Sequence, residues 1–165
     1  MEMISERLVP ASREAVWEAL NSPEVLRSCI AGCQKLEATD TDVYDVLMAV
    51  KIGPVSAKFQ GTMTLSDIVP PESYAIGFEG RGGMAGFAKG CATVKLVAPP
   101  EGGGTLLQYE VQAQVGGKLA QLGARLIDSS ARKMADDFFA RFVAHFATPA
   151  GDETGDEPLL EANRA

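Results

Sequence analysis

The chain has 165 residues, with a hydrophobic fraction of 46% and a charged fraction of 22%, a composition typical of one globular domain with a sizeable core. Its formal net charge of −7 argues against nucleic-acid binding, which requires a basic face. The sequence has three cysteines, one histidine, no recognisable signal peptide and no apolar run long enough to span a membrane. It therefore predicts a protein of the reducing cytoplasm.

Much of the acidity lies at the C-terminus. Residues 148–165 contain five acidic side chains and one basic one, so the net charge without them is −3. We therefore divide the chain into a folded domain, residues 1–147, and an acidic tail, residues 148–165, which we expect to be disordered.

A strand and two short helices are predicted first. The strand covers residues 2–9 and ends at Pro10. Ser12 is a candidate N-cap for a helix through Leu20. A further helical turn then ends near Ser28, and residues 29–33 are predicted to form a connecting loop.

Apolar and polar residues alternate between residues 34 and 115, as in strands with one buried face. Consecutive strands with short connections form an antiparallel meander. Because the polar positions recur regularly, one face of this sheet is expected to meet solvent and the other to be packed. The predicted strands are 34–39, 43–52, 56–68, 73–79, 87–98 and 105–115.

Residues 118–146 have the period of a long amphipathic helix. No other predicted element can cover the packed face of the sheet. The predicted fold is therefore α+β and of the helix-grip type, with a bent antiparallel sheet of about seven strands wrapped around the C-terminal helix and two short helices after the first strand. The apolar face of the helix is predicted to contain Leu119, Leu122, Leu126, Met134, Phe138, Phe142 and Phe146.

Small residues recur where the helix and the sheet should meet. Gly123 and Ser130 lie seven residues apart on the helix, and Gly61, Ala88 and Gly90 lie at inward strand positions. A filled core would have larger side chains there. Two interpretations remain open, a ligand cavity or a gap filled by large strand residues. The expected lining of the cavity is Met48, Phe59, Met63, Phe78, Phe87, Leu122, Leu126, Met134 and Phe138.

Few residues suit catalysis or metal binding. His145, the only histidine, lies near the end of the predicted helix, where complementing the helix dipole is the simpler role. Cys29 and Cys33 lack the second Cys/His pair of a zinc site, so we interpret them as loop thiols. We predict no catalytic residue and no metal site.

Two glycine-rich segments require interpretation. Residues 80–85 (GRGGMA) match the dinucleotide fingerprint, but they lie between two predicted antiparallel strands, so the phosphate-binding geometry is missing. We predict a hairpin, which either forms an apolar lip at the cavity mouth with Met84 and Phe87 or is a plain turn. Gly116 and Gly117 precede the long helix and either present N–H groups to an anion or form a tight turn, the interpretation we prefer.

Four segments together resemble the CoxG family, the G subunits of carbon monoxide dehydrogenase: CIAGC (29–33), GFAKGCATVKL (86–96), EGGGT (101–105) and VGGKLAQLGARLIDSSARKMADDFF (115–139). The resemblance covers residues 1–146, and its most specific parts are VGGKLAQLG and the Cys29/Cys33 pair. Ala31 stands where most relatives have proline. The family belongs to the START-like (SRPBCC) superfamily, whose helix-grip fold agrees with the predicted pattern.

The resemblance implies a non-catalytic accessory protein that serves a molybdenum carbon monoxide dehydrogenase or a related hydroxylase at the membrane. Such enzymes pass electrons to an acceptor, and an apolar cavity suits a quinone (menaquinone or ubiquinone) or another lipid as the ligand. No tightly bound cofactor is expected. The expected location is the cytoplasm, with peripheral contact at the inner face of the cell membrane.

Two other functions remain open. A START-like enzyme of the cyclase or hydrolase type, acting on an apolar substrate, needs an acid or base inside the cavity, and the inward candidates are Tyr44, Tyr74 and Tyr109. An assembly factor would instead bind the dehydrogenase without any ligand.

Overall fold

The structure, a computed structural model, describes residues 1–147, and the predicted acidic tail lies outside the described residues. The elements in chain order are β1 (Glu2–Val9), α1 (Arg13–Leu20), α2 (Pro23–Cys29), β2 (Cys33–Asp40), β3 (Val43–Ile52), β4 (Val55–Val69), β5 (Ser73–Arg81), the 3-10 helix η1 (Gly83–Ala85), β6 (Phe87–Val97), β7 (Thr105–Gly116), the 3-10 helix η2 (Ala120–Leu122) and α3 (Ala124–Ala147).

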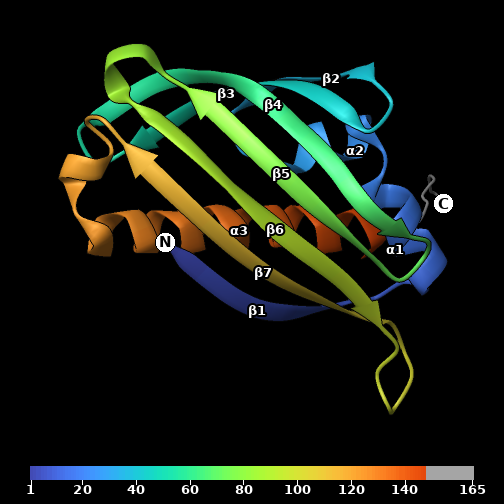
Figure 1. Ribbon diagram of the computed structural model, residues 1–165. Coiled ribbons are helices and arrows are strands. Elements are labelled where there is room, and N and C mark those ends of the chain that lie inside the picture. The colour runs from blue at the N-terminus through green and yellow to red at the C-terminus, as the bar shows by residue number, and fades with distance from the viewer. Residues whose placement is uncertain (148–165) are drawn as a thin grey trace, which may run out of the picture.

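The seven strands form one antiparallel sheet in the order β1-β7-β6-β5-β4-β3-β2. Strands β2 to β7 follow one another as the predicted meander, and β1 pairs with β7. The sheet bends around α3, which lies along its concave side (Figure 1). The predicted α+β helix-grip architecture is confirmed.

Glycines on the inner face allow neighbouring strands to approach closely where the sheet bends. A Cβ on Gly61 would lie 1.8 Å from the carbonyl oxygen of Glu79, and one on Gly90 would lie 2.0 Å from that of Gln112. No side chain tolerates such contacts with backbone atoms. These two glycines are therefore needed by the backbone, in addition to leaving the inner face free of bulky groups.

The long helix is shorter than predicted, because residues 118–123 are not part of it. Gly117 and Gly123 have φ angles of 72° and 91°, values that favour glycine and interrupt a helix. Helix α3 begins after Gly123, whose carbonyl oxygen accepts a hydrogen bond from the N–H of Ile127 (3.2 Å). Leu122 therefore lies in η2, and Leu119 lies directly before it. Gly123 does not share a helical face with Ser130.

The buried face of α3 also differs from the predicted row. Phe142 and Phe139 are its most buried residues, and Phe139 was not among the predicted ones. Met134 was predicted to face the sheet but is 40% exposed. A row of residues in steps of four drifts about 40° around the helix with each step. Two such steps from Phe142 lead to Met134, at the edge of the buried face.

Candidate functional site

Buried side chains gather at the two ends of the interface between helix and sheet. The larger cluster joins α1, α2 and the C-terminal half of α3 to the sheet and includes Val16, Leu107 and Phe142. The smaller cluster lies at the other end and is centred on Phe59 and Leu119. The two clusters share no residue.

Between the clusters, inward-facing side chains keep part of their surface exposed and belong to neither cluster. We call this region the central interior. Its inward orientation follows from the strand register, in which Met48 pairs with the buried Phe59 and Met63 pairs with Phe78. An interior packed to ordinary protein density would bury such side chains. The region is formed by Met48, Met63, Phe78, Ala88 and Ala113 of the sheet and Ile127 and Ala131 of α3, together with Leu126 beside the β3–β4 turn.

Seven of the nine predicted lining residues lie at the interface between helix and sheet. Met48, Met63, Phe78 and Leu126 belong to the central interior, and Leu126 approaches the β3–β4 turn, where a Cβ on Gly53 would lie 3.0 Å from its Cδ2 atom. The other three pack at the edges of this region: Phe59 and Leu122 in the smaller cluster, and Phe138 against the larger one.

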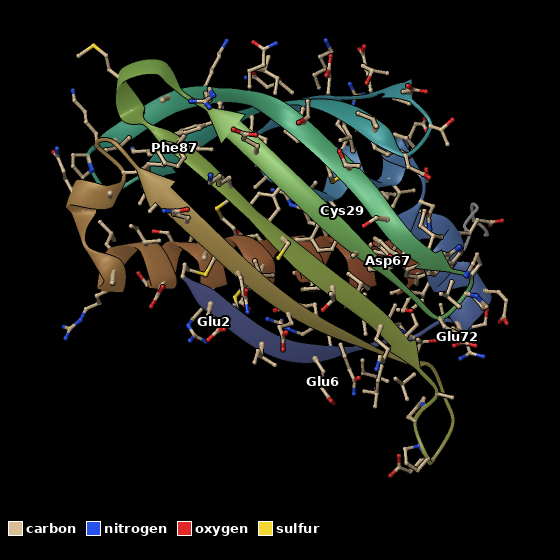
Figure 2. The ribbon with its side chains drawn as sticks, viewed as in Figure 1. Glu2, Glu6, Cys29, Asp67, Glu72 and Phe87 are labelled. Atoms are coloured by element: carbon tan, nitrogen blue, oxygen red, sulfur yellow. The ribbon has the colours of Figure 1, made fainter. Side chains whose placement is uncertain are left out.

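The remaining two predicted lining residues lie elsewhere. Met134 is at the exposed edge of α3, as described above. Phe87 pairs with Gly116, and the next pair along the strands, Ala88 and Val115, faces inward, so Phe87 faces outward. Its ring covers Gly116, where an added Cβ would lie 2.1 Å from it. Figure 2 shows Phe87 at the start of β6, close to η1.

Three connections close the end of the molecule that holds the smaller cluster: the β3–β4 turn, η1 and η2. The N–H of Leu119 donates a hydrogen bond to the carbonyl oxygen of Ala85 (3.0 Å), which ties the η2 segment to η1. Met84 in η1 is 81% exposed. The GRGGMA segment is thus a hairpin between β5 and β6, without the helix that a dinucleotide site requires.

Polar side chains flank the larger cluster, some at its solvent-facing rim and some buried. Arg7 on β1 forms an ion pair with Asp136 of α3, and its guanidinium lies 5.2 Å from the ring centroid of Phe139. The hydrogen bond with Asp136 raises the pKa of Arg7, and the nearby Tyr109 acts in the same direction. Sequence reasoning missed Arg7, although the weak alternation of β1 gave the signal that it faces inward.

Tyr74 on β5 is the most isolated of these polar groups. Its side chain is 6% exposed, and its ring meets Trp17 of α1 edge-on, with the centroids 5.4 Å apart. Burial raises the pKa of the Tyr74 hydroxyl above its ordinary value. Within residues 1–147 the hydroxyl has no hydrogen-bond partner.

The thiols and the other titratable groups do not assemble into a metal centre in the part of the chain that the structure describes. Cys29 is buried, Cys33 is half-buried and Cys91 is exposed, and all three are free. Burial raises the pKa of the Cys33 thiol. In the same residues no helix is both long and apolar enough to cross a bilayer.

Two hollows lie over the outer face of the sheet, with volumes of about 840 and 670 Å³. Exposed polar side chains contribute much of their lining, including Thr62, Lys89 and Gln112 in the larger hollow and Thr93 and Lys95 in the smaller. Ligand pockets are mostly apolar with a few placed polar groups. The central interior fits that description better, so we take it as the candidate site.

A seven-stranded sheet bent around a C-terminal helix, with partly exposed apolar side chains between them, defines a helix-grip protein of the START-like class. The chain belongs to the CoxG family, the G subunits of carbon monoxide dehydrogenase, whose model matches residues 6–146. The resemblance predicted from the sequence is thereby confirmed. No relative among curated proteins matches the chain.

Solved structures share this fold. A conserved protein from Geobacillus kaustophilus is 31% identical, with a TM-score of 0.83 over 89% of this chain and 95% of that one. A protein from Rhizobium leguminosarum is 22% identical, with a TM-score of 0.65 over 88% and 95% of the two chains. A protein from Thermus thermophilus is 16% identical, with a TM-score of 0.59 over 88% and 99%. The last two similarities bear on the fold alone.

Proposed function

We propose that this protein is a non-catalytic accessory protein of a molybdenum carbon monoxide dehydrogenase or a related hydroxylase, and that it binds a hydrophobic ligand between α3 and the sheet. Family membership supports the link to the dehydrogenase. The observation that supports the ligand is the central interior, where apolar side chains remain partly exposed between two packed clusters.

The chemistry of the central interior suits an isoprenoid quinone or a similar lipid. Burial of apolar surface is worth about 25 cal/mol per Å², so a tail that buries about 200 Å² gains roughly 5 kcal/mol. Met48 and Met63 lie opposite α3, and methionine side chains adapt to irregular apolar shapes. An apolar tail therefore needs no specific polar contact to be held there.

Ligand binding is tested by purifying the full chain, extracting it for lipids and analysing the extract by mass spectrometry. We expect a co-purifying apolar lipid, or saturable uptake of menaquinone by the lipid-free protein. Trp17, the only tryptophan, borders the interior through Tyr74, so quenching of its fluorescence reports uptake. A protein that is free of lipid and takes up no menaquinone would contradict the ligand proposal.

The same preparation tests the partner. We expect the tagged protein to retain the dehydrogenase subunits in a pulldown, with retention that changes when menaquinone is loaded. Retention that is identical with and without menaquinone, from a protein that takes none up, would identify a ligand-free assembly factor instead.

We also propose peripheral contact with an anionic membrane through the end of the molecule that contains the β3–β4 turn, η1 and η2, which we call the η1–η2 end. Segments 50–59, 79–90 and 114–128 hold six basic and two acidic residues, whereas the rest of residues 1–147 holds eight basic and fifteen acidic ones. Glu72 lies at the opposite end (Figure 2). The six basic residues are exposed, and each contributes about 1 kcal/mol near an anionic surface.

Reversing charge at the η1–η2 end is expected to weaken vesicle binding. The change is Lys118→Glu with Arg125→Glu, and the measurement is co-sedimentation with phosphatidylglycerol vesicles at low salt. We expect at least about a tenfold loss, because two attractive charges become repulsive. The matched control is Arg27→Glu with Arg141→Glu, two exposed residues outside this end. Equal losses in both double variants, or equal binding to neutral vesicles, would contradict the assignment.

A further inference from the structure

The polar side chains of the interior are gathered at one end. Tyr44 packs against the larger cluster, Tyr74 and Tyr109 belong to it, and Arg7 lies over the ring of Phe139 in the same cluster. At the η1–η2 end the inward side chains are apolar: Val50, Ile52, Ala57, Phe59 and Val115. The interior therefore has a polar end and an apolar end.

The polar groups differ in whether they have an ion-pair or hydrogen-bond partner. Arg7 is paired with Asp136 and interacts with the hydroxyl of Tyr109. Tyr44 is half-buried. Tyr74 and Tyr109 are both nearly fully buried, and neither hydroxyl has a hydrogen-bond partner among residues 1–147, but Tyr109 lies beside the guanidinium of Arg7, whereas Tyr74 lies beside Trp17 and Tyr44. Buried polar groups in folded proteins are almost always bonded, so an unbonded one calls for an explanation.

Tyr74 faces the same side of the sheet as the candidate site. It lies on the same face of β5 as Ile76 and Phe78, and Phe78 belongs to the central interior. Tyr44 lies close enough to affect the Tyr74 hydroxyl electrostatically. Tyr44 in turn pairs with Met63 of the central interior. Tyr44 therefore adjoins the central interior, and Tyr74 lies next to Tyr44 at the polar end.

The chemistry of a buried tyrosine defines the group that it can bind. Burial raises the pKa of the Tyr74 hydroxyl, so the group stays protonated and acts as a hydrogen-bond donor. The simplest acceptor without charge is a carbonyl oxygen, as in a quinone, ketone or ester. A site with such a donor favours a ligand that bears the acceptor over one that lacks it.

We propose that the interior orients its ligand, with an oxygen-bearing head group at the polar end accepting a hydrogen bond from the Tyr74 hydroxyl and a hydrocarbon tail extending toward the η1–η2 end. This inference rests on the proposed function and adds the ligand class, an apolar chain that carries a carbonyl group at one end. It also makes Tyr74 the residue that distinguishes such a ligand from a plain hydrocarbon.

The test is Tyr74→Phe, assayed in the full chain with menaquinone and with squalene, an isoprenoid hydrocarbon that has no oxygen. We expect menaquinone affinity to fall about five- to twentyfold through the loss of one buried hydrogen bond. Squalene affinity should change by less than about twofold. Both probes are measured by retention after gel filtration and mass spectrometry. The matched control is Thr105→Val, which removes a buried hydroxyl that already donates a hydrogen bond to the carbonyl oxygen of Ala11 (2.8 Å) and should leave both affinities unchanged.

The melting temperature of Tyr74→Phe shows whether a loss of affinity reflects a loss of folding. Removing an unbonded buried hydroxyl should leave that temperature unchanged or slightly higher. If the native protein binds neither probe, the proposed function itself fails. If menaquinone binds the native protein and Tyr74→Phe equally well, or if Tyr74→Phe weakens both probes alike, ligand binding stands and the proposed orientation is wrong.

Discussion

Replacing Phe142 with alanine is expected to lower the free energy of unfolding by about 3–5 kcal/mol. Phe142 is 0% exposed, and its ring centroid lies 5.5 Å from that of Phe138 and 5.2 Å from that of Phe146. The substitution removes the ring from the centre of the larger cluster and leaves a cavity that rigid neighbours cannot close. Urea denaturation followed by circular dichroism measures the change.

The matched control lies on the same helix. Met134→Ala removes a large apolar side chain that is 40% exposed, so we expect it to cost less than about 1 kcal/mol. If the two substitutions cost the same, α3 would present to the sheet the face predicted from the sequence, and the placement of Met134 at the exposed edge of α3 would be wrong. If Phe142→Ala cost as little as Met134→Ala, the larger cluster would not hold α3 in place.

The strands could be predicted closely because their signal is local. Alternation of apolar and polar residues sets which side chains share a face, and glycine or proline marks every turn of the meander except Thr41-Asp42. The strand predicted over residues 43–52 has the same bounds in the structure. The start of α3 was misplaced because apolar residues keep a helical spacing through Leu119 and Leu122, while the break depends on the φ angles of Gly117 and Gly123.

The candidate site could be predicted only in part, because some of its features depend on contacts between distant parts of the chain. Inward positions such as Met48 and Met63 follow from alternation within one strand. Met134 was misplaced because helical periodicity does not fix how far a helix rotates against a sheet. The unbonded state of the Tyr74 hydroxyl depends on residues that are distant in sequence, among them Trp17, and no local pattern reports it.

Filling the central interior is expected to abolish ligand binding without harming the fold. Ala113 faces α3 from β7, pairs with Gly90 and belongs to neither buried cluster. In Ala113→Phe the added ring would occupy the space assigned to the ligand, so we expect menaquinone affinity to fall at least about a hundredfold, because the tail loses most of its burial. Fluorescence quenching of Trp17 measures the binding, and urea denaturation measures the stability.

The free energy of unfolding distinguishes a ring that fills a void from a ring that overpacks a filled core. A phenyl group forced into a filled core costs about 1–3 kcal/mol, whereas one placed in a void should leave the free energy of unfolding unchanged or raise it through added apolar burial. Gln114→Phe, at the next position on the outer face, carries the same ring and should leave menaquinone affinity unchanged. A stability loss of a few kcal/mol in Ala113→Phe alone would mean that helix and sheet are already in full contact at Ala113. The two interpretations of the small residues at this interface would then be decided in favour of a filled core.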